Sequence, residues 1–264
     1  EADRLGLFFT PMIFINGVEL KGWDAPMALV RTVEQLAATN PPPRPPTFDH
    51  PPTAFEKYIA DWREQSVIAL PPDPNAWTLG PPAATIKIVV WGDYQEPGTA
   101  EMDAIIRAFV AGRTDTQYSY RHYPFNSDCN PNIKERRFPL GCRAAQAAEA
   151  AGRLAGNDGF WKMHTWLMEN QKSFSDDALR AAAGRLGLDA DALFAALDGD
   201  DVRQRVLDDV EAGRQLPRLR LGMPTGVHGI PSIFINGKFL PRARLNEKPV
   251  LREILEAAAA APEP

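Results

Sequence analysis

The fold is decided by the stretch "TIKIVVWGDYQEPGTAEMDAIIRAF", residues 85–109. Its first seven residues form a nearly continuous apolar run, which is typical of a central strand covered on both faces. The apolar residues after the turn recur at helical spacing and predict an amphipathic helix. They are Met102, Ile105, Ile106, Phe109 and Val110. The stretch therefore predicts a buried strand that turns sharply, at residues 96–99, into a helix.

A repeat provides the second strong signal. "TPMIFINGVEL" (residues 10–20) and "IPSIFINGKFL" (residues 230–240) match at seven of eleven positions, and each leads into an amphipathic helix. The Asn-Gly pair in each copy predicts a type I′ hairpin turn. Two copies so far apart indicate two units of one domain type. Only the second copy has room for a whole domain before it, so we expect the first copy to be the final part of a domain.

Composition excludes several classes of protein. The chain has 264 residues and a net charge of −5, which argues against a nucleic-acid binder with a basic face. It contains no run of about 18 apolar residues, so we expect no membrane span. Of its 25 prolines, 12 lie between Pro41 and Pro82, which predicts a semi-rigid linker. Residues 53–65 within it carry apolar side chains at helical spacing and predict a short helix.

The order of the remaining elements predicts an α/β fold. "TQYSYRHYPF" (residues 116–125) is typical of a second strand, and a block of helices follows at about 142–216. Ser, Asp and Gly stand where these helices should begin and end. The expected order is strand, helix, strand, helical block, hairpin and helix.

This order, together with four local motifs, resembles the thioredoxin fold with a helical insertion, as in DsbA-like disulfide oxidoreductases. The motifs are "GDYQ", "RHYPF", "DGFWKMHTWLMENQ" and "GIPSIFINGKFL". The resemblance implies three parts: the C-terminal portion of a first thioredoxin-like domain at 1–40, the proline-rich linker at 41–82, and a DsbA-like domain at 83–264. The resemblance to the whole fold extends over about residues 79–261. Residues 1–40 resemble only the last third of the same fold.

The resemblance places a Cys-X-X-Cys motif where this chain has Glu96, Pro97, Gly98 and Thr99. Disulfide exchange needs a thiolate and a resolving thiol, so we expect no catalytic residue at this turn. A helix N-terminus favours an anion, and Glu96 at the N-cap would supply one, with Pro97 as the first helical residue. Two interpretations stay open: a plain helix-capping carboxylate, or a fixed charge with a function.

The two cysteines, Cys129 and Cys142, lie in a polar segment between the second strand and the helical block. Three interpretations stay open: a structural surface disulfide, a switchable redox pair, or two free thiols. A disulfide would favour an extracytoplasmic location, in the periplasm or cell envelope. The four histidines, His50, His122, His164 and His228, show no spacing typical of metal binding. We therefore expect no metal ion and no cofactor.

Two functions remain open. The first is a redox-inactive binding or scaffold module, because the resemblance implies a peptide groove formed by Ile230, Pro231, Glu96 and Thr99. Both Ile230–Pro231 and Thr10–Pro11 are expected to be cis. Its partner would be an extended peptide or another protein. The alternative is a thiol-disulfide oxidoreductase that uses Cys129 and Cys142, or a first domain incomplete in this chain. The apolar hairpin of the first copy also predicts packing on another surface, a homodimer being one way to achieve it.

Overall fold

The computed structural model describes residues 10–16, 18–41, 54–220, 222–245 and 248–260. His50, Leu7, Phe8 and Phe9, as well as Gly17 of the first Asn-Gly turn, lie outside the described residues. The chain divides into two compact units, residues 1–64 and 65–264. The boundary falls inside the segment 41–82 that was predicted to be a linker.

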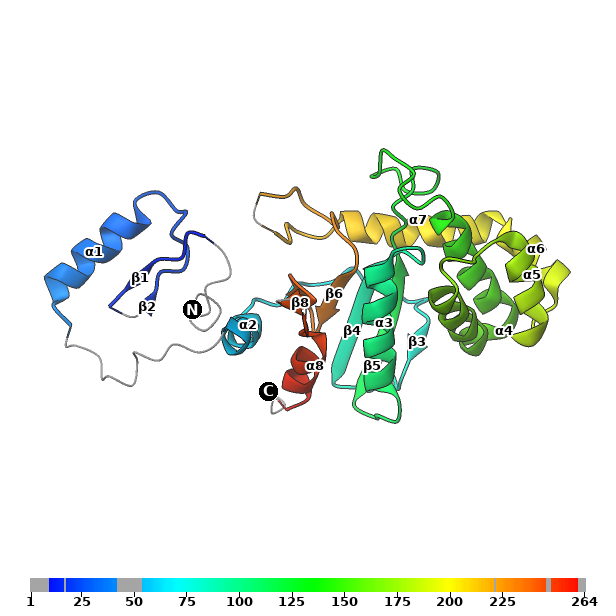
Figure 1. Ribbon diagram of the computed structural model, residues 1–264, viewed down its shortest axis with the longest axis horizontal. Helices are drawn as coiled ribbons and strands as arrows, with labels where there is room; N and C mark the ends of the chain where they lie inside the picture. Colours follow the sequence, from blue (N-terminus) through cyan, green and yellow to red (C-terminus); the bar gives the residue numbers. More distant parts are fainter. Residues whose placement is uncertain (1–9, 17, 42–53, 221, 246–247, 261–264) are drawn as a thin grey trace. The chain divides into compact units, whose positions relative to one another are not determined.

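The described residues of the first unit form one hairpin and two helices (Figure 1). Strand β1 (Phe14–Ile15) pairs with β2 (Val18–Glu19), and helix α1 (Ala28–Thr39) follows. Helix α2 (Ala54–Arg63) confirms the short helix predicted in the proline-rich region. Lys57 binds both Glu19 and Asp61, at 2.5 and 2.7 Å, and thereby ties α2 to the hairpin within this unit.

The second unit is built on a five-stranded sheet with the order β3-β5-β4-β6-β7. Strands β4 (Ile86–Gly92) and β5 (Thr116–His122) are parallel, whereas β3 (Thr78–Leu79), β6 (Ser232–Ile235) and β7 (Lys238–Leu240) pair with antiparallel neighbours. The predicted type I′ turn is confirmed here, because Asn236 and Gly237 both have positive φ, 49° and 72°. A second short pair joins β8 (Arg244–Leu245) to β9 (Lys248–Pro249).

Helices cover this sheet and form the insertion (Figure 1). Helix α3 (Pro97–Val110) contacts β5 and α8 (Leu251–Ala259), and α7 (Asp200–Arg214) contacts β5. Helix α4 (Gly141–Glu169) begins the predicted helical block and has a kink at Ala155 and Gly156, whose backbone angles are not helical. Helices α5 (Asp176–Arg185) and α6 (Ala190–Leu197) complete the insertion.

The core explains why β4 is a continuous apolar run. Ile86, Ile88 and Val90 are buried, and so is Trp91, which points into a second cluster on the other face. That cluster joins Trp91 to Tyr123, Val210, Leu216, Val227, Phe234 and Phe239. Because both faces of β4 are covered, nearly every residue of the strand has to be apolar.

Candidate functional site

The turn after β4 places Glu96 at the N-cap of α3. Its carboxylate accepts hydrogen bonds from the Gly98 N–H at 2.9 Å, the Thr99 N–H at 2.5 Å and the Thr99 hydroxyl at 2.8 Å. Pro97 is the first helical residue, where its missing N–H leaves no bond unmade. The side chain of Glu96 therefore supplies the anion that a helix N-terminus favours.

A chain of buried polar side chains includes Tyr94, which belongs to this turn. The hydroxyl of Tyr94 lies 2.9 Å from Nδ1 of His164, whose Nε2 lies 2.8 Å from the carboxylate of Asp103. Burial lowers the pKa of His164, while the charges of His164 and Arg107 lower the pKa of Asp103 despite its burial. The ring of His164 thus bridges the hydroxyl of Tyr94 and the carboxylate of Asp103. The sequence offered no sign of this pairing, because 61 residues separate the histidine from its carboxylate.

A second buried carboxylate lies at the start of the turn. Asp93 is 1% exposed and accepts the N–H groups of Gln95 and Phe125, both at 2.8 Å. Burial raises the pKa of Asp93 to about 6, although these two hydrogen bonds act in the opposite direction. Its carboxyl group therefore changes charge near neutral pH.

A surface groove of about 300 Å³ brings the two sequence-predicted parts of the site together. Glu96 and Gly98 line it from α3, and Ile230 and Pro231 line it from the start of the second hairpin. Thr99 is fully buried instead, and Pro97, Cys129 and Cys142 do not line the groove. The Thr10–Pro11 and Ile230–Pro231 peptide bonds are both cis.

Arginines give the groove a mixed charge. Arg220, Arg242 and Arg244 line it together with the carboxylates of Glu96 and Glu101. Arg244 forms an ion pair with Glu101, and Arg220 donates to the carbonyl of Pro241 at 2.8 Å. The carboxylate of Glu96 is already engaged by the helix N-terminus.

Cys129 and Cys142 form a disulfide, with Cα atoms 5.8 Å apart. This excludes the interpretation as two free thiols. Cys129 is half-buried and Cys142 is 9% exposed, since it belongs to the first turn of α4. The predicted surface position therefore holds for the segment between the cysteines and not for Cys142 itself.

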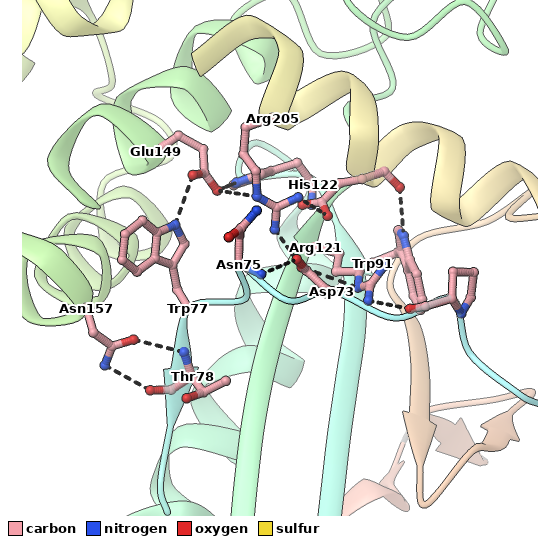
Figure 2. Close-up of polar contacts among 12 residues, drawn as sticks. Asp73, Asn75, Trp77, Thr78, Trp91, Arg121, His122, Glu149, Asn157 and Arg205 are labelled. Atoms are coloured by element: carbon pink, nitrogen blue, oxygen red, sulfur yellow. Dashed lines mark hydrogen bonds and ion pairs between the residues drawn. The ribbon is translucent and has the colours of Figure 1, made fainter. Parts of the chain in front are cut away.

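Figure 2 shows a further polar cluster beneath the helical insertion. One ligand atom each from His122, Glu149 and Asp209 lies within 4.8 Å of the others, a spacing that suits a metal ion. However, the guanidinium of Arg205 binds Asp209 at 2.7 Å and lies 4.0 Å from Glu149. A cationic side chain thus already balances these carboxylates, and the cluster is an internal ion-pair network.

The segment 68–79 completes this network from outside the helices (Figure 2). Asp73 accepts from Arg205 at 2.6 Å, and the indole of Trp77 donates to Glu149 at 2.9 Å. Burial alone would raise the pKa of Glu149, but the hydrogen bond of His122 and the charge of Arg205 lower it. The sequence did not predict these contacts, because Asp73 and Arg205 are 132 residues apart.

Comparison with known proteins now adds the family. Residues 131–248 match the family model described as "DSBA-like thioredoxin domain". The second unit has the fold of a DsbA-like thioredoxin domain. The predicted fold class, an α/β thioredoxin-like fold with a helical insertion, is therefore confirmed.

Solved structures of DsbA-like proteins share this fold. BdbD from Bacillus subtilis, in its oxidised form, has a TM-score of 0.57 and 17% identity, covering 75% of this chain and all of that chain. The catalytic domain of Proteus mirabilis ScsC has a TM-score of 0.53 and 20% identity, covering 78% of this chain and 99% of that chain. MdbA from Corynebacterium diphtheriae, a thiol-disulfide oxidoreductase, has a TM-score of 0.50 and 19% identity, covering 76% and 98%.

Curated relatives include much longer proteins. The Na(+)/H(+) antiporter NhaA 1 of Salinispora arenicola (strain CNS-205) is 30% identical over 172 residues, which are 65% of this chain and 23% of that protein. The chain thus spans about a quarter of the length of the curated relatives it matches. Among the residues that the structure describes, no helix is long and apolar enough to cross a membrane.

Proposed function

We propose that the DsbA-like domain binds an extended peptide or protein segment in the groove beside Pro231, without disulfide exchange at the Glu96 turn. One observation carries the proposal: the carboxylate of Glu96 occupies the N-terminus of α3, with bonds to Gly98 and Thr99. Disulfide exchange requires a thiolate that attacks and a second thiol that resolves the mixed disulfide. Neither Glu96 nor Thr99 can supply one.

Peptide binding does not need the missing thiols. An extended segment can pair with exposed main-chain groups, and the backbone at Ile230 borders the groove. The arginines of the groove favour a segment with acidic side chains. An extracytoplasmic location is part of the proposal, because the Cys129–Cys142 disulfide persists in an oxidising compartment. A homodimer in which a second copy covers the first hairpin also remains a proposal.

Insulin reduction by dithiothreitol tests the redox half of the proposal. We expect the wild-type chain to reduce insulin no faster than dithiothreitol alone. The double variant Glu96→Cys/Thr99→Cys restores a Cys-Pro-Gly-Cys turn at the same helix N-terminus and should gain activity. Wild-type turnover that disappears in Cys129→Ser/Cys142→Ser would instead support the alternative, an oxidoreductase acting through that pair.

Peptide binding is tested with the reduced, carboxymethylated insulin B chain as the extended probe. We expect its addition to shift the amide resonances around Ile230. Ala243→Trp, which fills the groove, should abolish the shifts, whereas Ala111→Trp, at an exposed alanine outside the groove, should not. Shifts that survive Ala243→Trp would contradict the proposed binding site.

A further inference from the structure

The segment between the two cysteines borders the Glu96 turn. Leu140, immediately before α4, donates its N–H to the side-chain oxygen of Gln95 at 2.5 Å. Gln95 is the neighbour of Glu96, and Cys142 follows Leu140 by two residues. A single hydrogen bond, from Leu140 to Gln95, therefore separates the backbone next to the disulfide from the backbone of the turn.

Asp93 contacts the chain shortly before each cysteine, at Phe125 and at Gly141. Its carboxylate accepts the N–H of Phe125, and the carbonyl of Phe125 accepts the N–H of Arg137 at 3.0 Å. At the other end, α4 begins against Asp93 so closely that a Cβ on Gly141 would lie 2.7 Å from a carboxylate oxygen. The disulfide closes the loop from Cys129 to Cys142 and so links these two contact points.

The two cysteines differ in their exposure to solvent. Cys129 is half-buried in a segment whose residues from 127 to 141 are mostly exposed, whereas Cys142 is 9% exposed within the first turn of α4. Cys129 is therefore the cysteine that an incoming thiolate reaches more readily. The leaving sulfur is then that of Cys142, and a helix N-terminus favours its thiolate form. The carboxylate of Asp93, beside the start of α4, disfavours a negative charge on the sulfur of Cys142. The neighbouring cation, Arg143, is paired with Asp176 and Asp198.

We propose that the Cys129–Cys142 disulfide is a thiol-exchange site that controls the order of the Glu96 turn. A thiolate from an external dithiol attacks the sulfur of Cys129, the bond between the two cysteines breaks, and Cys142 leaves as a thiolate that takes up a proton. The second thiol of the reagent then attacks the mixed disulfide and releases Cys129. The protein disulfide is reduced to two thiols, and the dithiol is oxidised to its disulfide.

Reduction frees the loop and weakens the bond from Leu140 to Gln95 and the contact of Gly141 with Asp93. The turn that presents Glu96 to the groove then loses part of its support. This inference rests on the proposed function only in that the turn borders the peptide groove. The two can fail separately, because order in the turn is measured with no peptide present.

Hydrogen exchange of the full chain, oxidised and after treatment with dithiothreitol in native buffer, tests the proposal. We expect alkylation to label both cysteines and the peptide covering residues 93–99 to exchange about tenfold faster after reduction. The peptide covering α2, which belongs to the first unit, serves as the control and should not change. In Gln95→Ala, whose coupling bond is absent, the turn should exchange faster already when oxidised, and reduction should add little.

Two results would overturn the proposal. Cysteines that resist alkylation until urea unfolds the protein would show an inaccessible structural disulfide. A turn whose exchange is unchanged in the fully reduced protein would show that the disulfide and the turn are independent. The variant Cys129→Ser/Cys142→Ser provides the same comparison without reductant: exchange at residues 93–99 that matches the oxidised wild type would also contradict it.

Discussion

Phe14 and Phe234 hold the same position in the two repeat copies, yet Phe14 is 41% exposed and Phe234 is fully buried. The helices differ in the same way. Helix α1 has no buried residue, and Leu29, Val30 and Val33 are each more than 40% exposed. In α8, Leu251, Ile254 and Leu255 are fully buried. Nearly identical hairpins thus end in opposite environments.

The difference comes from what each copy pairs with. In the second copy, β6 pairs with β4 along Ile88–Trp91, and α8 contacts α3. In the described part of the first copy, β1 pairs with β2 in a sheet of two strands. A two-stranded hairpin is marginal in water, whereas a central strand next to it creates a core. The repeat sequence therefore specifies the hairpin and the helix locally. Their burial depends on β4 and α3, which precede the second copy in the chain and pack against it.

The largest expected effect compares the two phenylalanines directly. Phe234→Ala should destabilise the second unit by about 3–5 kcal/mol, because it removes a fully buried ring. Phe14→Ala should cost less than about 1 kcal/mol, since much of that ring stays in water. Urea unfolding followed by tryptophan fluorescence measures both. Equal losses would show that the two hairpins are equally packed. A loss for Phe14→Ala that grows with protein concentration would support covering by a second copy.

The second prediction concerns the buried carboxylate of Asp93, which directly follows strand β4 of the second unit. Because burial raises the pKa of Asp93 to about 6, the folded state binds its proton more tightly than the unfolded state. Stability from this group is present at low pH and is lost as the pH rises through 6. Between pH 4.5 and 7.5 the wild type should lose about 2 kcal/mol relative to Asp93→Asn. Urea unfolding of both proteins at the two pH values measures this, and parallel curves would contradict it.

The smallest expected effect is at the helix cap. Glu96→Ala removes the acceptor for three hydrogen bonds and should cost about 1 kcal/mol. Glu96→Gln keeps an acceptor without the charge and should cost about half as much. Ser175→Ala, at the cap of α5, is the matched control for an ordinary helix start. Thermal unfolding of the three variants distinguishes a simple cap from a turn whose stability does not depend on Glu96.

Local patterns explain what the sequence could predict. The apolar run of β4, the helical spacing of α3 and the Asn-Gly turn at Asn236 each depend on neighbours within a few residues. The N-cap role predicted for Glu96 belongs to the same class. The resemblance to DsbA-like proteins then predicted how these elements are arranged. That arrangement places Glu96 and Pro231 beside the same groove, and both residues line it.

What the sequence could not predict depends on residues far apart in the chain. Strand β3 has only two residues and lies in a proline-rich region with no apolar alternation. The partners of His122 and His164 are carboxylates that the fold brings to them from α3 and α4. The raised pKa of Asp93 results from burial, which no local motif records. Only the assembled tertiary structure contains these signals.

The anchoring of residues 68–79 decides where this domain can be cut from its chain. Ile68 donates its N–H to the carbonyl of Gly237, and Arg121 donates to the carbonyl of Pro71, so the segment is fastened along its length. A fragment that begins at Ala83 would lack an edge strand and leave the buried charge of Arg205 without Asp73. Removing one partner of a buried charged pair is costly. A fragment that contains the whole domain should therefore start upstream of Ile68, within the segment 41–82 that was predicted to be a linker.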